Sequence, residues 1–96
     1  MTNANKNDAN KTAVLAALEN VRSALKNESP SPDVARALDQ CDRLALSINQ
    51  FHAEGLRFAA FTLLHMVLSR GTVFTEPVHI ATRALKAALD TAGYPH

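Results

Sequence analysis

The sequence predicts an all-α fold, a small antiparallel bundle of about four helices. Alanine occurs 17 times and leucine 12 times among the 96 residues, and these two residues lead the intrinsic helix scale. Apolar residues recur at spacings of three and four residues in four segments, which is the helical period. With the exception of Gly55, the glycines and prolines lie where a helix could begin or end.

Length and charge indicate a single domain with no dedicated polyanion-binding surface. A chain of 96 residues has the size of one domain. Ten Lys and Arg oppose nine Asp and Glu, a net charge of +1, which argues against a dedicated nucleic-acid binder. Residues 1–9 are rich in asparagine and lack apolar anchors, so we predict a disordered tail there. Residues 10–96 then form a single helical domain.

The single cysteine and the N-terminal residues indicate the cellular compartment of the protein. Cys41 has no second cysteine with which to form an intrachain disulfide. The first residues lack the apolar core of a signal peptide, and no apolar run approaches the length of a membrane span. We therefore predict a cytoplasmic protein that has no membrane contact.

The first predicted helix covers residues 11–27. Its apolar residues follow one another at spacings of four, three and four, so they form one narrow stripe: Val14, Leu18, Val21 and Leu25. The charged residues lie off this stripe. The segment therefore has one face for the core and one for water.

The second predicted helix covers residues 32–53 and has the clearest start signal in the chain. Ser31 suits the N-cap, Pro32 suits the first helical position, and Asp33 complements the positive helix end. Cys41 is expected to act as a small buried hydrophobe. It belongs to an apolar arc that consists of Val34, Ala37, Leu38, Cys41, Leu44, Ala45, Ile48 and Phe51.

The third predicted helix, residues 55–70, is apolar over more than half of its circumference. A helix of this kind is buried on most sides. We therefore expect it at the centre of a monomeric bundle, or covered by a second copy of the chain. Its apolar residues are Leu56, Ala59, Ala60, Phe61, Leu63, Leu64, Met66, Val67 and Leu68.

Gly55 leaves the boundary between the second and third helices open. We favour a break there, but no good N-cap precedes Leu56 and the two apolar arcs stay in phase across the glycine. A single glycine costs a helix only about 1 kcal/mol. The alternative is one continuous or kinked helix over residues 32–70.

The fourth predicted helix begins after Thr75 and ends before Gly93. Thr75 is expected to cap it with its side chain, and Gly93 is a typical C-terminal stop. Phe74, just before it, is expected to tuck against the core. The apolar stripe of this helix comprises Val78, Ala81, Leu85, Ala88, Leu89 and Ala92.

The sequence contains no catalytic signature. It has no Ser/His/Asp or Cys/His arrangement, no glycine-rich phosphate loop and no Cys-x-x-Cys, so we expect neither enzymatic activity nor a cofactor. The favoured function is self-association, as a homodimer, or binding to another protein through the apolar third helix. The predicted interface consists of Phe58, Phe61, Leu64, His65 and Leu68.

A ligand or metal site is the first alternative. Histidine and carboxylate side chains are common metal ligands, and His52, Glu54 and His65 lie at or after the junction of the second and third helices. The simpler interpretation of His52 is a half-buried side chain at the C-terminal end of the second helix, where its ring bonds a backbone carbonyl and complements the helix dipole.

A nucleic-acid-binding regulator is the second alternative. His79, Arg83 and Lys86 form a basic stripe on the fourth helix, with His79 expected in water. Asp90 continues the same stripe, and the other basic residues are scattered along the chain. Nucleic-acid binding usually needs a larger basic cluster than this one.

Overall fold

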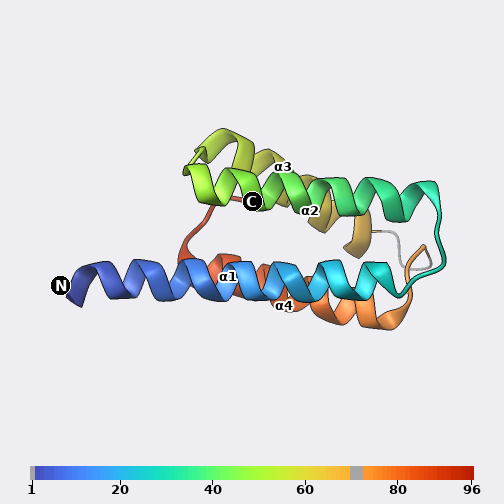
Figure 1. Ribbon diagram of the computed structural model, residues 1–96, viewed down its shortest axis with the longest axis horizontal. Helices are drawn as coiled ribbons and strands as arrows, with labels where there is room; N and C mark the ends of the chain where they lie inside the picture. Colours follow the sequence, from blue (N-terminus) through green and yellow to red (C-terminus); the bar gives the residue numbers. More distant parts are fainter. Residues whose placement is uncertain (1, 70–72) are drawn as a thin grey trace.

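The protein, as given by a computed structural model, folds into four α-helices (Figure 1). The structure describes the backbone of residues 2–69 and 73–96 and the side chains of residues 9–69 and 73–96. The helices are α1 (Thr2–Lys26), α2 (Pro32–Gln50), α3 (Ala53–Leu68) and α4 (Glu76–Ala92). No strand occurs among the described residues. The predicted all-α fold is confirmed.

The helices run alternately in opposite directions and form two layers, α2 with α3 and α1 with α4 (Figure 1). Contacts are most extensive within each layer and sparsest between α3 and α4. Within the described part of the chain each helix packs against two others. No helix is central, so the expectation that the third helix lies at the centre of the monomer is wrong. Two neighbours cover one face of α3 and leave the opposite face outside.

The predicted apolar stripes meet in one core. The four stripe residues of α1 are at most 2% exposed, and Phe74 packs against the core from the loop before α4, as expected. The other buried apolar residues of the core are Val34, Ala37, Cys41, Leu44 and Ile48 of α2, Leu56, Ala59, Ala60, Leu63, Leu64 and Val67 of α3, and Val78, Leu85 and Leu89 of α4.

The bounds of α1 differ from the prediction at its start. The helix begins at Thr2, whereas the apolar stripe indicates a start near residue 11. The backbone of residues 2–9 is thus part of α1, and the behaviour of residues 1–9 as a tail stays a prediction. At the other end the helix stops at Lys26, one residue before the expected end.

The start signal of α2 is confirmed. The Ser31 hydroxyl accepts a hydrogen bond from the backbone N–H of Val34 at 3.1 Å. Pro32 opens the helix and Asp33 lies in its first turn. All three features are local, which explains why sequence alone could identify them.

Thr75 precedes α4 as its N-cap, but its side chain makes no capping bond to the helix. Instead the hydroxyl donates a hydrogen bond to the carboxylate of Glu28, and the Thr75 backbone N–H donates to the same carboxylate at 3.2 Å. Glu28 belongs to the α1–α2 connector. Thr75 is therefore the N-cap residue as predicted, but its hydroxyl binds Glu28 and so links the two connectors at one end of the bundle.

A break between α2 and α3 is confirmed, and a continuous helix is wrong. The break lies at Phe51 and His52, however, and not at Gly55, which is in the first turn of α3. The chain leaves the helical path at Phe51, which adopts the left-handed conformation with φ 54°. His52 then caps α3, with its Nδ1 accepting a hydrogen bond from the Gly55 N–H at 2.9 Å. Because Phe51 no longer follows the helix, it is 76% exposed and not on the buried arc as expected.

Cys41 is fully buried among apolar side chains. Burial raises the pKa of its thiol to about 12, although the nearby positive charge of Arg22 opposes this rise. The thiolate is the reactive form. At mildly alkaline pH the folded protein therefore presents almost no reactive sulfur.

We expect Cys41 of the folded protein to react with an aromatic disulfide reagent at least about a hundredfold more slowly than in unfolded protein, because both ionisation and access require opening of the bundle. Stopped-flow absorbance near pH 8 measures the rate. The urea-unfolded chain is the control. Equal rates in the two states would contradict the buried position of Cys41.

Candidate functional site

Five residues form a stripe along the outer side of α3, which we call the outer stripe: Glu54, Phe58, Phe61, His65 and Leu68. At its C-terminal end Leu68 also packs against the core. The five residues recur at spacings of four, three, four and three residues. This is the a and d pattern by which helices pair in coiled coils. Phe58 is 67% exposed and Phe61 56% exposed, while Leu68 is half-buried. The outer stripe thus places two aromatic rings in water.

The opposite face of the same helix belongs to the core. Leu56, Leu63 and Val67, with their neighbours on that face, are buried. Exposure of the Phe58 and Phe61 rings to water is unfavourable, because full burial of a phenylalanine side chain contributes roughly 1.5–3 kcal/mol of free energy. Exposed apolar side chains that gather on one surface mark interaction sites in soluble proteins. The outer stripe is therefore the strongest candidate for a functional surface.

A groove of about 350 Å³ runs along the outer stripe between α3 and α4. Within it the rings of Phe61 and His65 stack, with centroids 5.6 Å apart. The hydroxyl of Ser69 donates a hydrogen bond to the His65 carbonyl. The groove is lined by Phe61, Leu64, His65, Leu68, Ser69, Lys86 and His96.

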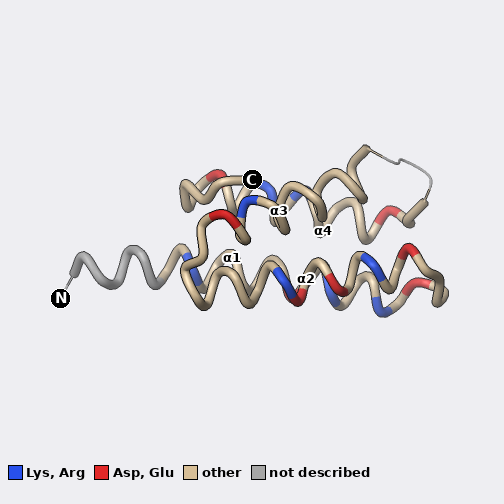
Figure 2. The backbone as a smooth tube through the Cα atoms, turned by 90° about the horizontal axis from the view of Figure 1, so that it is seen from above, with Lys and Arg blue, Asp and Glu red and all other residues tan. Residues whose placement is uncertain are grey.

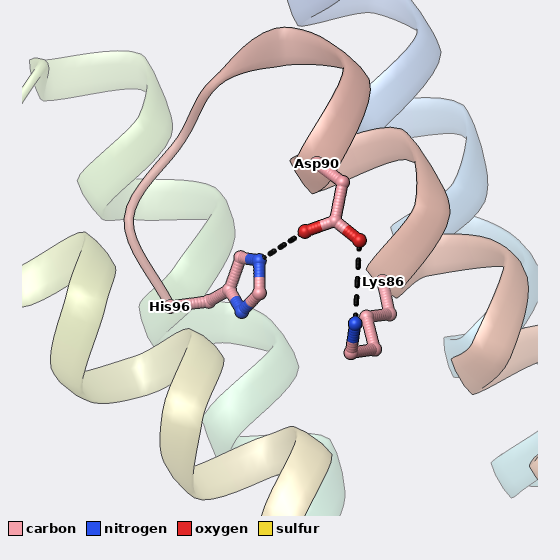
Figure 3. Close-up of polar contacts among 3 residues, drawn as sticks. All are labelled: Lys86, Asp90 and His96. Atoms are coloured by element: carbon pink, nitrogen blue, oxygen red, sulfur yellow. Dashed lines mark hydrogen bonds and ion pairs between the residues drawn. The ribbon is translucent and has the colours of Figure 1, made fainter.

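A polar cluster of Lys86, Asp90 and His96 lies on the α4 side of this groove (Figure 3). The carboxylate of Asp90 lies 2.6 Å from Nε2 of His96 and 3.3 Å from Nζ of Lys86. The hydrogen bonds of His96 and then of Lys86 hold the pKa of Asp90 below its ordinary value. The contact folds the C-terminal segment back toward α3, and it pairs the positive charge of Lys86 with a carboxylate.

Four of the five predicted interface residues, Phe58, Phe61, His65 and Leu68, lie on the outer stripe. The fifth, Leu64, is only 8% exposed and belongs to the core where it borders the groove. Sequence reasoning did not place Glu54 on this stripe. The signal was present, because Glu54 continues the spacing of the stripe by four residues before Phe58.

The residues of the predicted metal site are not brought together. Position 65 lies about 20 Å beyond position 52 along the axis of α3, at 1.5 Å per residue. The ring of His52 already caps the helix, while that of His65 stacks on Phe61. Among the described residues, no group of three or more His, Cys, Asp or Glu side chains could hold a metal ion.

His79 is buried, at 7% exposure, where the sequence predicted a side chain in water. Among the described residues its Nε2 has no hydrogen-bond partner, and neither has the hydroxyl of the fully buried Thr82, one turn later. The reason is that α4 packs against both α1 and α3. Its buried face is therefore wider than the narrow apolar stripe indicates.

The remaining cations of the predicted basic stripe lie beside carboxylates. Arg83 lies 3.4 Å from Glu76, and Lys86 contacts Asp90. The positive charges of Arg83 and Lys86 are therefore each offset by a neighbouring carboxylate. Elsewhere blue and red segments are interspersed along α1 and α2 (Figure 2).

A second cavity, of about 270 Å³, lies at the end of the bundle where the α2–α3 turn meets α1 and the C-terminal segment. The ammonium group of Lys11 lies 5.1 Å from the centre of the Phe51 ring, a cation–π contact. None of the predicted site residues lines it. The lining residues are Asn10, Lys11, Ile48, Phe51, Ala53, Leu56, Ala92, Tyr94 and Pro95.

Comparison with known proteins gives no relative for this chain. No protein-family model, curated protein or solved structure matches it. None of the helices in the described residues has an apolar stretch that could cross a membrane. Function must therefore be inferred from the surface of the molecule itself.

Proposed function

We propose that this chain is a small non-enzymatic helical protein that acts by protein–protein contact, as a self-associating protein, through the outer stripe of α3. The observation that carries the proposal is the exposure of Phe58 and Phe61 on a helix whose other face is core. Aromatic residues are enriched at the centres of interfaces. An interface there would remove both rings from water.

The spacing of the stripe supports the same proposal. A 4–3 repeat on the outside of a helix gives a straight seam that another helix can cover along its length. Other exposed apolar side chains, such as Leu46 and Ile80, stand on different helices. Single exposed apolar residues are common on soluble proteins and need no partner.

A cytoplasmic location is part of the proposal. The one cysteine is buried and forms no disulfide in the described chain. A free thiol in a small domain suits a reducing compartment. The localisation of a tagged chain in the producing cell would test this point.

We expect Phe61→Ser to shift the protein toward monomer, because the ring is lost from both copies of the interface. Light scattering over a wide range of concentrations measures the mass. Ile80→Ser is the matched control, since Ile80 and Phe61 are both 56% exposed but Ile80 lies on α4. The wild type and Ile80→Ser should approach the mass of a dimer as the concentration rises.

Two outcomes would overturn the proposal. A wild-type protein that stays monomeric at all concentrations would exclude self-association. An equal decrease of the molar mass measured for Phe61→Ser and Ile80→Ser would exclude the outer stripe as the site of association. Circular dichroism of each variant separates loss of association from loss of fold.

A further inference from the structure

We infer that the outer stripe binds a second copy of this chain in antiparallel orientation, with Phe58 of each copy against Phe61 of the other and Glu54 of each against His65 of the other. The inference rests on the proposed function and specifies its partner and register. It follows from the order of residues along the stripe and from the side chains of Glu54 and His65, which have no hydrogen-bond partner among the described residues.

The order of residues makes the stripe complementary to itself. In a twofold antiparallel pair, residues at equal distances on opposite sides of the axis face each other. If the axis passes between Phe58 and Phe61, Phe58 of each copy faces Phe61 of the other copy. Glu54 lies four residues before Phe58 and His65 four residues after Phe61. Glu54 and His65 then face each other as well, twice in the dimer.

The carboxylate of Glu54 is available for such a contact. Within residues 9–69 and 73–96 it is the one side-chain carboxylate with no hydrogen bond or ion pair. Glu54 is exposed in the first turn of α3, beside Arg57 and the two phenylalanines. A partner for Glu54 must therefore come from outside the described chain.

The imidazole of His65 is available too. Its ring stacks on Phe61, but neither ring nitrogen has a hydrogen-bond partner among the described residues. The groups that face it across the groove are Lys86, which Asp90 holds, and His96. The carboxylate on the α4 side, Asp90, is occupied by Lys86 and His96. A carboxylate from a second copy would therefore supply the acceptor that His65 lacks among the described residues.

Charge also selects the orientation. In a parallel pair the same positions face each other, so Glu54 would oppose Glu54 and His65 would oppose His65. Like groups across an interface are unfavourable, whereas a carboxylate can accept a hydrogen bond from imidazole. The antiparallel arrangement replaces the repulsive Glu54–Glu54 contact with two contacts in which a carboxylate can accept a hydrogen bond from an imidazole.

A charge exchange tests the register. We expect Glu54→Lys and His65→Glu, each alone, to raise the dissociation constant of the dimer by about tenfold or more. Glu54→Lys removes the carboxylate that would accept a hydrogen bond from His65, and His65→Glu places two carboxylates together twice. The double variant restores opposite charges and should return to within about threefold of the wild type. Sedimentation equilibrium measures the three constants, and circular dichroism checks the fold.

Glu76→Lys is the matched control for Glu54→Lys. Glu76 also lies exposed in the first turn of a helix, so the variant causes a similar loss of dipole complementation, but it lies off the outer stripe. We expect it to leave the dissociation constant unchanged. If the double charge-exchange variant associates no better than the single variants, the register is wrong although self-association stands. A monomeric wild type would instead overturn the proposed function.

Disulfide trapping gives an independent result. In a Cys41→Ser background, Glu54→Cys combined with His65→Cys should cross-link two chains under mild oxidation, whereas Glu54→Cys alone should not, because its like position in the other copy is distant. Efficient cross-linking by Glu54→Cys alone would show a parallel pair and would overturn the inference. Denaturing electrophoresis without reductant measures the outcome.

Discussion

Replacement of Leu63 by alanine is expected to lower the free energy of unfolding by about 2–5 kcal/mol. Leu63 is fully buried on the inner face of α3. Truncation removes apolar contacts and leaves a cavity that the packed helices fill only in part. Urea denaturation at a fixed protein concentration, followed by circular dichroism, measures the change.

Leu46→Ala is the matched control, since it makes the same chemical change on α2 at a residue that is 56% exposed. We expect it to change the free energy of unfolding by less than about 1 kcal/mol. Comparable losses in the two variants would contradict the arrangement of the bundle, because the cost of truncation depends on burial.

Leu63 and Phe61 show that one side of α3 packs in the core and the other side forms the proposed interface. They are two residues apart and lie on opposite sides of the helix, one fully buried and one 56% exposed. Burial of Leu63 stabilises the monomer, whereas Phe61 contributes to the fold only weakly. Substitutions on the two sides of α3 should therefore change stability and association separately, so the proposed interface can be tested without unfolding the monomer.

The sequence predicted the features of the fold that depend on nearby residues. The stripe of α1 and the Ser31 cap follow from helical periodicity and from hydrogen bonds over three residues. Features that depend on distant residues were missed. The Thr75 hydroxyl binds Glu28, which is 47 residues away. Burial of His79 depends on how α4 sits between its neighbours, which a single helix does not reveal.

The candidate site was only partly predictable for the same reason. A helical projection identified Phe58 and Phe61 as a possible surface, but it could not separate the two apolar sides of α3, and Leu64 was grouped with them. Burial distinguishes the core side from the outer stripe. The free state of the Glu54 carboxylate depends on every neighbour and was not accessible from the sequence.

Gly55→Ala is expected to destabilise the protein by up to about 1 kcal/mol, although alanine is normally favoured over glycine in a helix by about 1 kcal/mol. A Cβ atom at position 55 would lie 2.7 Å from Nδ1 of His52 and 2.8 Å from Oγ of Ser47. The His52 ring would have to move, and it would lose the hydrogen bond from the Gly55 N–H. Loss of an N-cap costs about 0.5–2 kcal/mol.

A double-mutant cycle with His52→Ala tests this cause. Once the ring is absent, the added methyl group meets only the Ser47 hydroxyl, which can rotate away. Gly55→Ala should then regain the stabilising effect of alanine, so the two substitutions are strongly non-additive in urea denaturation. If Gly55→Ala stabilises the wild-type protein by about 1 kcal/mol, as alanine does in an unconstrained helix, the His52 cap is wrong.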